Sequence, residues 1–99
     1  MSDNFKLVFI KWIEWLNQEK RISANTLDAY KRDLIKWSEF SKNVEKPKKA
    51  DFRLYMSFLV EKGNSRSSIA RKISSIRNFY RFASKRNYLS SEDLDLIKT

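Results

Sequence analysis

The chain has 99 residues and a formal net charge of +9, and it contains neither cysteine nor histidine. Disulfides and thiolate metal sites are therefore excluded, and the commonest general base at neutral pH is missing. One glycine and one proline are too few for the many tight turns of an all-β protein. The composition therefore predicts a single domain that is built of helices.

A first helix is predicted over roughly residues 3–20. Apolar residues recur there at helical spacing, which indicates a buried stripe of Phe5, Val8, Phe9, Trp12 and Leu16, widened by Ile13 and Trp15. Leu7 and Ile10 fall on the opposite side of this helix. We expect them either to be buried against the C-terminal segment or to contact a neighbouring protomer.

The N-terminal segment has no targeting or membrane-spanning character. Lys6, Lys11 and Glu14 interrupt its apolar residues, so it is neither a signal peptide nor an apolar run of the length that crosses a bilayer. The sequence therefore predicts a soluble protein of the cytoplasm.

A second helix is predicted from Ser23, a good N-cap, to about residue 42. Its buried face is expected to hold Leu27, Tyr30, Leu34, Trp37 and Ser41, with Asn25, Asp28, Arg32, Lys36 and Glu39 opposite. A connector with Pro47 follows, because proline bars a continuous helix. A third helix over about 49–62 is then expected to bury Phe52, Tyr55, Met56, Leu59 and Val60, and Gly63 ends it in the usual place for a left-handed residue.

The fourth helix, predicted over about 65–86 with Ser65 as its cap, carries most of the charge imbalance. Residues 66–86 contain seven basic and no acidic side chains. One stripe of this helix is apolar and consists of Ile69, Ile73, Ile76, Tyr80 and Ala83, flanked by Phe79. The reverse side gathers Ser67, Arg71, Ser74, Asn78, Arg81 and Lys85, with Ala70 and Arg77 at its margin.

The last residues, "LSSEDLDLI", read as the start of one more short helix. Ser90 and Asp93 have the spacing of a capping box, and Leu89 and Leu94 that of a hydrophobic staple. The expected fold is thus all-α: a compact bundle of four helices and a short C-terminal helical segment.

The polar side of the fourth helix mixes arginine with small hydroxyl and amide side chains. Small residues let a helix lie close to another surface, and arginine and asparagine can contact phosphates and base edges. This pattern is typical of a recognition helix in the major groove of DNA, with its arginines outside the core and unpaired with acidic groups of the same molecule. The alternatives are a solvated basic face, an anionic membrane or calmodulin, RNA, and a protein-interaction module.

Two stretches resemble one known family. "RISANTLDAYKRDLIKWSEF" and "GNSRSSIARKISSIRNFYRFASKRNYL" are similar to the N-terminal, SAM-like core-binding domain of tyrosine recombinases. The closest likeness is to the Xer-type chromosome-dimer resolvases and similar phage integrases. In the second helix the shared pattern is Ser-x-Asn-Thr-x-x-x-Tyr-x-x-Asp-Leu. "FIKWIEWLNQEKRIS" also fits the opening of the family, so the resemblance covers nearly the whole chain.

The resemblance implies that the second and fourth helices approach the major groove of duplex DNA at a recombination site. The residues expected to contact DNA are Asn25, Thr26, Tyr30, Arg32, Lys36, Ser67, Arg71, Lys72, Ser74, Ser75, Arg77, Asn78 and Arg81. A packing role remains the alternative for Tyr30, which also lies on the buried face, and for Ser75, which lies off the centre of the polar face.

The family's catalytic residues lie in a downstream domain, and this sequence lacks the His-x-x-Arg context of that domain. The resemblance therefore implies a non-enzymatic DNA-binding domain over 1–90, with 91–99 beginning the linker toward a catalytic domain. A stand-alone helical nucleic-acid-binding protein is the alternative. The expected partners are double-stranded DNA and other recombinase protomers on that DNA. No cofactor, metal, membrane or small-molecule ligand is expected, and the chain is expected to be monomeric away from DNA.

Overall fold

Four amphipathic helices account for most of residues 2–89, the part of the chain that the computed structural model describes. They are α1 (Asp3–Gln18), α2 (Ala24–Phe40), α3 (Lys49–Glu61) and α4 (Arg66–Lys85). No strand occurs within residues 2–89. The all-α prediction is therefore confirmed, and each predicted helix lies within about two residues of an observed one. The predicted fifth helical segment lies outside the described residues.

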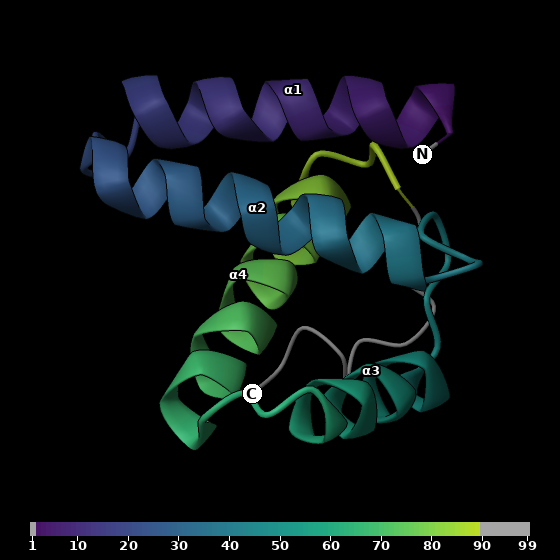
Figure 1. Ribbon diagram of the computed structural model, residues 1–99. Helices are drawn as coiled ribbons and strands as arrows, with labels where there is room; N and C mark the ends of the chain where they lie inside the picture. Colours follow the sequence, from purple (N-terminus) through teal and green to yellow (C-terminus); the bar gives the residue numbers. More distant parts are fainter. Residues whose placement is uncertain (1, 90–99) are drawn as a thin grey trace.

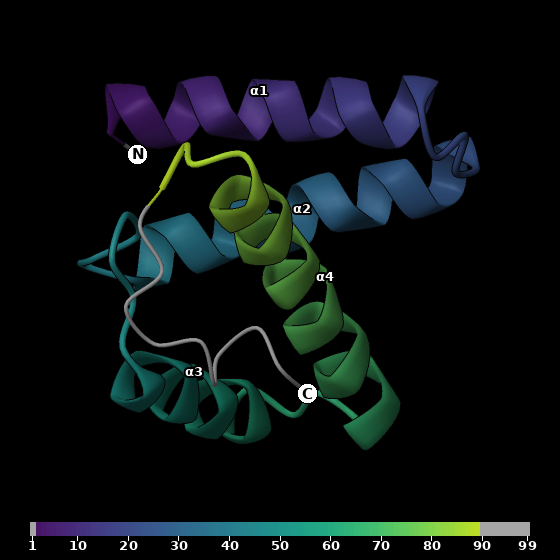
Figure 2. The ribbon, with the colours of Figure 1, turned by 180° about the vertical axis from the view of Figure 1, so that it is seen from behind.

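The helices are arranged so that α4 touches all three others (Figure 1). α1 and α2 run side by side in opposite directions, and α3 lies at the far end of the molecule from α1. Figure 2 shows α4 from the other side, passing across α2 from the region of α3 up to α1. The most extensive helix–helix contact is between α2 and α4. The mutual position of α2 and α4 therefore decides what surface the two helices present together.

Local chemistry explains where these helices begin and end. The hydroxyls of Ser23 and Ser65 each accept a hydrogen bond from a first-turn amide, of Thr26 and Ser68 respectively, at 3.2 Å. Gly63 has φ +85°, in the left-handed region that an L side chain rarely adopts, and the N–H of the next residue closes the turn on the carbonyl of Leu59 at 3.1 Å. These three predicted signals are confirmed.

The core draws on all four helices and is rich in aromatic rings. Its largest fully buried side chains include Trp12, Trp37, Tyr55 and Phe5. The indole of Trp37 donates to the hydroxyl of Tyr80 at 2.8 Å, and that hydroxyl donates to the carbonyl of Val44. These bonds satisfy polar groups that would otherwise be costly to bury, and burial also raises the pKa of Tyr80 above its ordinary value.

Two residues of the predicted core are exposed instead of buried. Met56 and Val60 are 40% and 63% exposed, because α3 packs on the rest of the protein along the narrower stripe of Phe52, Tyr55 and Leu59. Leu7 and Ile10, which the sequence places opposite the stripe of α1, are 54% and 47% exposed. Burial of this pair against the C-terminal segment, one of the two expectations, lies outside the described residues.

Candidate nucleic-acid interface

The polar side of α4 forms a continuous face along the helix. Ser67, Ser74 and Lys85 are exposed, and Asn78 and Arg81 are half-buried. At about 100° per residue these side chains fall within a narrow sector of the helix surface. The sequence of α4 contains no aspartate or glutamate, so nothing within this helix offsets its positive charge. The predicted segregation of apolar and polar sides is confirmed.

Asp33 of α2 brings three residues of α4 together at the margin of this face. Its carboxylate is 1% exposed and lies 3.1 Å from Nη1 of Arg71 and 3.3 Å from Nζ of Lys72. It also accepts a hydrogen bond from the hydroxyl of Ser75 at 3.0 Å. A buried carboxylate is tolerable only with such partners. This cluster fixes how α2 sits against α4.

The positions of Lys72 and Ser75 correct the prediction that both contact DNA. Ser75 has no exposed surface, and both acceptors within reach of its single O–H lie within the protein, at the Asp33 carboxylate and the carbonyl of Lys72. Lys72 is 9% exposed. At about 100° per residue Lys72 lies roughly 140° around the helix from Ser67, on the side of the core. Both residues join α4 to α2, and neither belongs to the candidate interface.

Arg71 departs from its prediction in a different way. We expected the arginines of this face to have no acidic partner within the molecule, and that expectation is wrong for Arg71. Its side chain nevertheless remains 40% exposed. A guanidinium carries five N–H donors, so the contact through Nη1 orients the group and leaves further donors for other partners.

Asn78 is held in place from the opposite side, by α1. The indole N–H of Trp12 donates to Oδ1 of Asn78 at 2.9 Å, and Trp12 itself has no exposed surface. This hydrogen bond uses the amide oxygen and so determines which end of the amide points outward. The side-chain NH₂ of Asn78, a pair of donors, is the end left for a ligand.

α2 presents the other predicted contacts. Asn25, Thr26, Arg32 and Lys36 are exposed. The Thr26 hydroxyl accepts a hydrogen bond from Ser23 at 2.9 Å, which ties it to the helix cap. Tyr30 is half-buried and its ring stacks on that of Trp12, with centroids 5.9 Å apart and an interplanar angle of 4°. Tyr30 thus packs against α1, which is the alternative that the sequence left open for it.

Sequence reasoning missed that Asp33 binds three residues of α4. It also missed two cations that lie near the C-terminal end of α4, namely Lys20, which follows α1, and Arg86. A signal for Asp33 was present, because Tyr30, Asp33, Leu34 and Trp37 follow one helical stripe. An aspartate on an apolar stripe needs buried partners, and the basic fourth helix is the part of the sequence that can supply them.

Arg77, at the margin of the polar face, is half-buried.

Two classes of site are not found in the described part of the chain. Residues 2–89 contain no cluster of three side chains suited to holding a metal ion. Their helices are also too short or too polar to span a lipid bilayer.

Comparison with known proteins identifies the family. Residues 9–87 match the family of phage integrase N-terminal SAM-like domains. Tyrosine recombinase XerC of Chlorobaculum parvum is 34% identical, over 90% of this chain and 31% of that protein. Tyrosine recombinase XerD of Staphylococcus saprophyticus is 32% identical, over 90% of this chain and 32% of that protein.

The chain spans about a third of the length of these relatives. No solved structure matches it. The match to the family extends from α1 to the end of α4 and therefore covers the whole candidate interface. The chain thus belongs to the family of phage-integrase N-terminal SAM-like domains, in the form found in Xer-type tyrosine recombinases.

Proposed function

We propose that this chain binds duplex DNA at a recombination site, as the N-terminal domain of a tyrosine recombinase of the cytoplasm. The observation that carries the proposal is the polar face of α4, where cationic and small polar side chains line one side of a helix without any acidic residue. A helix of this kind fits the major groove, which is about 12 Å wide. Attraction to the phosphates supplies much of the affinity.

Two side chains in this proposal are held in advance by the protein. Asp33 orients Arg71 through one nitrogen, and Trp12 orients Asn78 through its amide oxygen. Each then offers donors to phosphate oxygens or to acceptors on base edges. Because the protein has already fixed these rotamers, less conformational entropy is lost when DNA binds.

Strand cleavage is assigned to the part of the relatives that this chain does not cover, about two-thirds of their length. None of the tyrosines in this chain is proposed as a nucleophile. Tyr55 and Tyr80 are buried in the core, and Tyr30 is stacked on Trp12. Binding and strand exchange are therefore expected to be separable properties of the full recombinase.

The test is a mobility-shift assay of the 99-residue chain with a palindromic recombination site and a scrambled duplex, each at two salt concentrations. If about five phosphates are contacted, the plot of log affinity against log salt has a slope of about −4 to −5. Arg77→Ala and Arg81→Ala should each weaken binding by about 1–3 kcal/mol. Arg53→Ala, on the exposed side of α3, is the matched control and should not. An affinity that does not change with salt concentration would contradict the proposal that the chain binds DNA.

A second contact is favoured by Leu7 and Ile10, which lie exposed on α1. We propose that they pack against a neighbouring protomer when recombinases assemble on DNA. Changing both to serine should lower the cooperativity of binding to a two-site duplex and leave the affinity for a single half-site unchanged. Equal cooperativity of the variant and the parent would contradict this assignment.

A further inference from the structure

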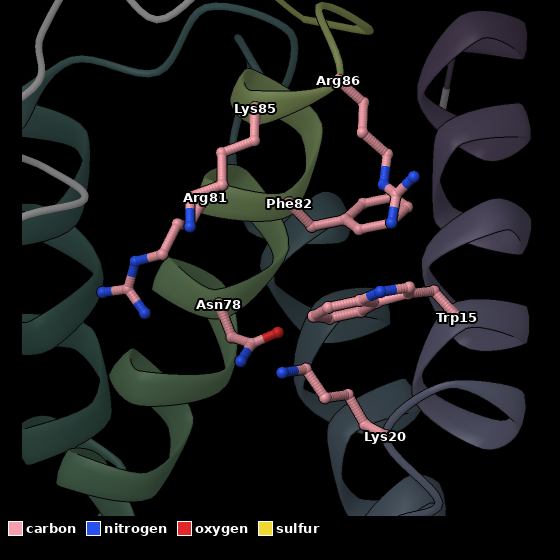
Figure 3. A pocket seen from close by; sticks show the side chains of 7 residues that line it. All are labelled: Trp15, Lys20, Asn78, Arg81, Phe82, Lys85 and Arg86. Atoms are coloured by element: carbon pink, nitrogen blue, oxygen red, sulfur yellow. The ribbon is translucent and has the colours of Figure 1, made fainter.

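A hollow of about 490 Å³ lies between the end of α1 and the last turns of α4. Four cations line it, namely Lys20, Arg81, Lys85 and Arg86, together with the rings of Trp15 and Phe82. Figure 3 shows the Trp15 ring reaching from α1 toward α4, with Arg86 on one side of it and Lys20 on the other. Among residues 2–89, no acidic side chain lines this hollow.

The aromatic rings hold two of these cations at the wall of the hollow. The Lys20 ammonium lies 5.2 Å from the centroid of Trp15, and the guanidinium carbon of Arg86 lies 4.7 Å from that of Phe82. Contact with a ring face leaves the N–H donors in the plane of a guanidinium available. Within residues 2–89, neither Lys20 nor Arg86 forms an ion pair with an acidic side chain.

The backbone at the end of α1 positions Lys20 at the edge of this hollow. The amide of Lys20 donates to the carbonyl of Trp15 at 3.2 Å, and the next residue, Arg21, has φ +50°. A left-handed arginine is uncommon, so the chain turns sharply at this point. The ammonium and the indole are therefore brought to the same side of the helix end.

We propose that this hollow binds a phosphodiester of the DNA backbone, so that the DNA contact extends from α4 to the end of α1. The inference rests on the proposed function. Three residues of the hollow, Asn78, Arg81 and Lys85, also belong to the polar face of α4, so the two surfaces are continuous. With α4 in the major groove, one of the DNA strands that border this groove passes over the hollow. Its phosphate meets the cations, and the apolar side of its deoxyribose meets the edge of Trp15.

Lys20, Lys85 and Arg86 place like charges around one hollow, and a bound anion relieves the repulsion between them. The volume exceeds what a lone phosphate needs and falls within the range of ordinary ligand pockets. That surplus favours a sugar–phosphate segment over a free inorganic ion. Experiments with duplex DNA and with inorganic phosphate distinguish a backbone phosphodiester from a free phosphate ion as the ligand.

The first experiment measures the salt dependence of duplex binding by Lys20→Gln/Arg86→Gln. Loss of these contacts should make the log–log slope shallower by about 1–2 and weaken specific and scrambled duplexes alike, because a phosphate contact carries no sequence information. Lys49→Gln/Arg53→Gln, which removes two exposed charges of α3, is the matched control and should keep the slope of the parent. Equal slopes for both double variants would overturn the inference while leaving the proposed function intact.

The second experiment uses the unmodified chain and the fluorescence of Trp15. Trp12 and Trp37 have no exposed surface, so Trp15 is the tryptophan that solutes reach. Iodide, an anion, should quench it more strongly than neutral acrylamide does. Saturating duplex DNA should protect it, and Trp15→Phe should abolish the quenchable signal.

The outcomes of this second experiment separate the two proposals. Protection by duplex but not by millimolar inorganic phosphate supports the backbone assignment. Protection by inorganic phosphate at equal strength would replace it with a general anion site. Bound duplex with Trp15 still open to iodide would overturn the inference alone, whereas no binding of duplex at all would overturn the proposed function.

Discussion

The carboxylate of Asp33 on α2 lies 3.1 Å from the guanidinium of Arg71 on α4, and the carboxylate is 1% exposed whereas the arginine side chain is 40% exposed. The pair therefore spans the boundary between the core and the proposed DNA-binding face. Lys72 and Ser75 complete the set of partners on the buried side. One acidic residue thus anchors the helix and orients a side chain of the proposed DNA-binding face.

Asp33→Ala should lower the free energy of unfolding by about 3–5 kcal/mol, because it leaves the ammonium of Lys72 buried without its counter-charge. Urea denaturation at pH 7 measures this loss. Asp28→Ala, on the exposed side of the same helix, is the matched control and should stay within about 0.5 kcal/mol of the parent. Asp33→Asn/Lys72→Met should be more stable than Asp33→Asn alone. If the two changes were simply additive, the ion pair would not be the cause.

Asn78 allows stability and binding to be separated by two substitutions. Asn78→Ala removes the acceptor of the Trp12 indole N–H and should cost about 1–3 kcal/mol of stability. Asn78→Asp keeps an acceptor oxygen and should recover most of that loss, yet its negative charge should weaken duplex binding. Thermal unfolding and the NMR resonance of the indole N–H report the first effect, and mobility shift reports the second. An aspartate variant that binds DNA like the parent would place Asn78 outside the interface.

Ile73 and Val60 were both expected in the core from their spacing, and the structure separates them. Ile73 is 6% exposed and Val60 is 63% exposed. Ile73→Ala should therefore cost about 2–5 kcal/mol through lost burial and the cavity left behind. Val60→Ala should change stability by less than about 0.5 kcal/mol. Similar losses for both in urea denaturation would contradict the observed position of α3.

The contrast between Ile73 and Val60 shows what the sequence could predict. Helix bounds depend on neighbours along the chain, and Ser23, Ser65 and Gly63 act within one turn. Periodicity likewise identified the two sides of α4, because Ile73 and Ser74 follow a repeat that is visible without a partner helix. The width of the buried stripe on α3 depends instead on how much of its surface the other helices cover, and the sequence of α3 alone does not show this.

The same limit applies to the candidate interface. The resemblance to the recombinase family implied that Lys72 and Ser75 contact DNA. Both instead bind Asp33 within the protein, and Asp33 is 39 residues from Lys72 in the sequence. The bond between Trp12 and Asn78 joins residues 66 positions apart. Contacts of this kind depend on how α1, α2 and α4 cross. The sequence supplied the polar face, and tertiary packing decided which of its members point outward.

The hydroxyl of Tyr55 makes the stability of the fold sensitive to alkaline pH. Burial, followed by the negative charges of Asp33 and Glu39, raises the pKa of Tyr55 to about 12 from an ordinary value of 10.0. A raised pKa in the folded state stabilises the protein fully below pH 10, and this contribution is lost as the pH rises toward 12. The free energy of unfolding, measured by urea denaturation, should therefore fall between these two pH values. Tyr55→Phe should show a shallower fall, because one titrating group is gone. An equally steep fall in that variant would assign the effect to other groups, with Tyr80 the first to examine.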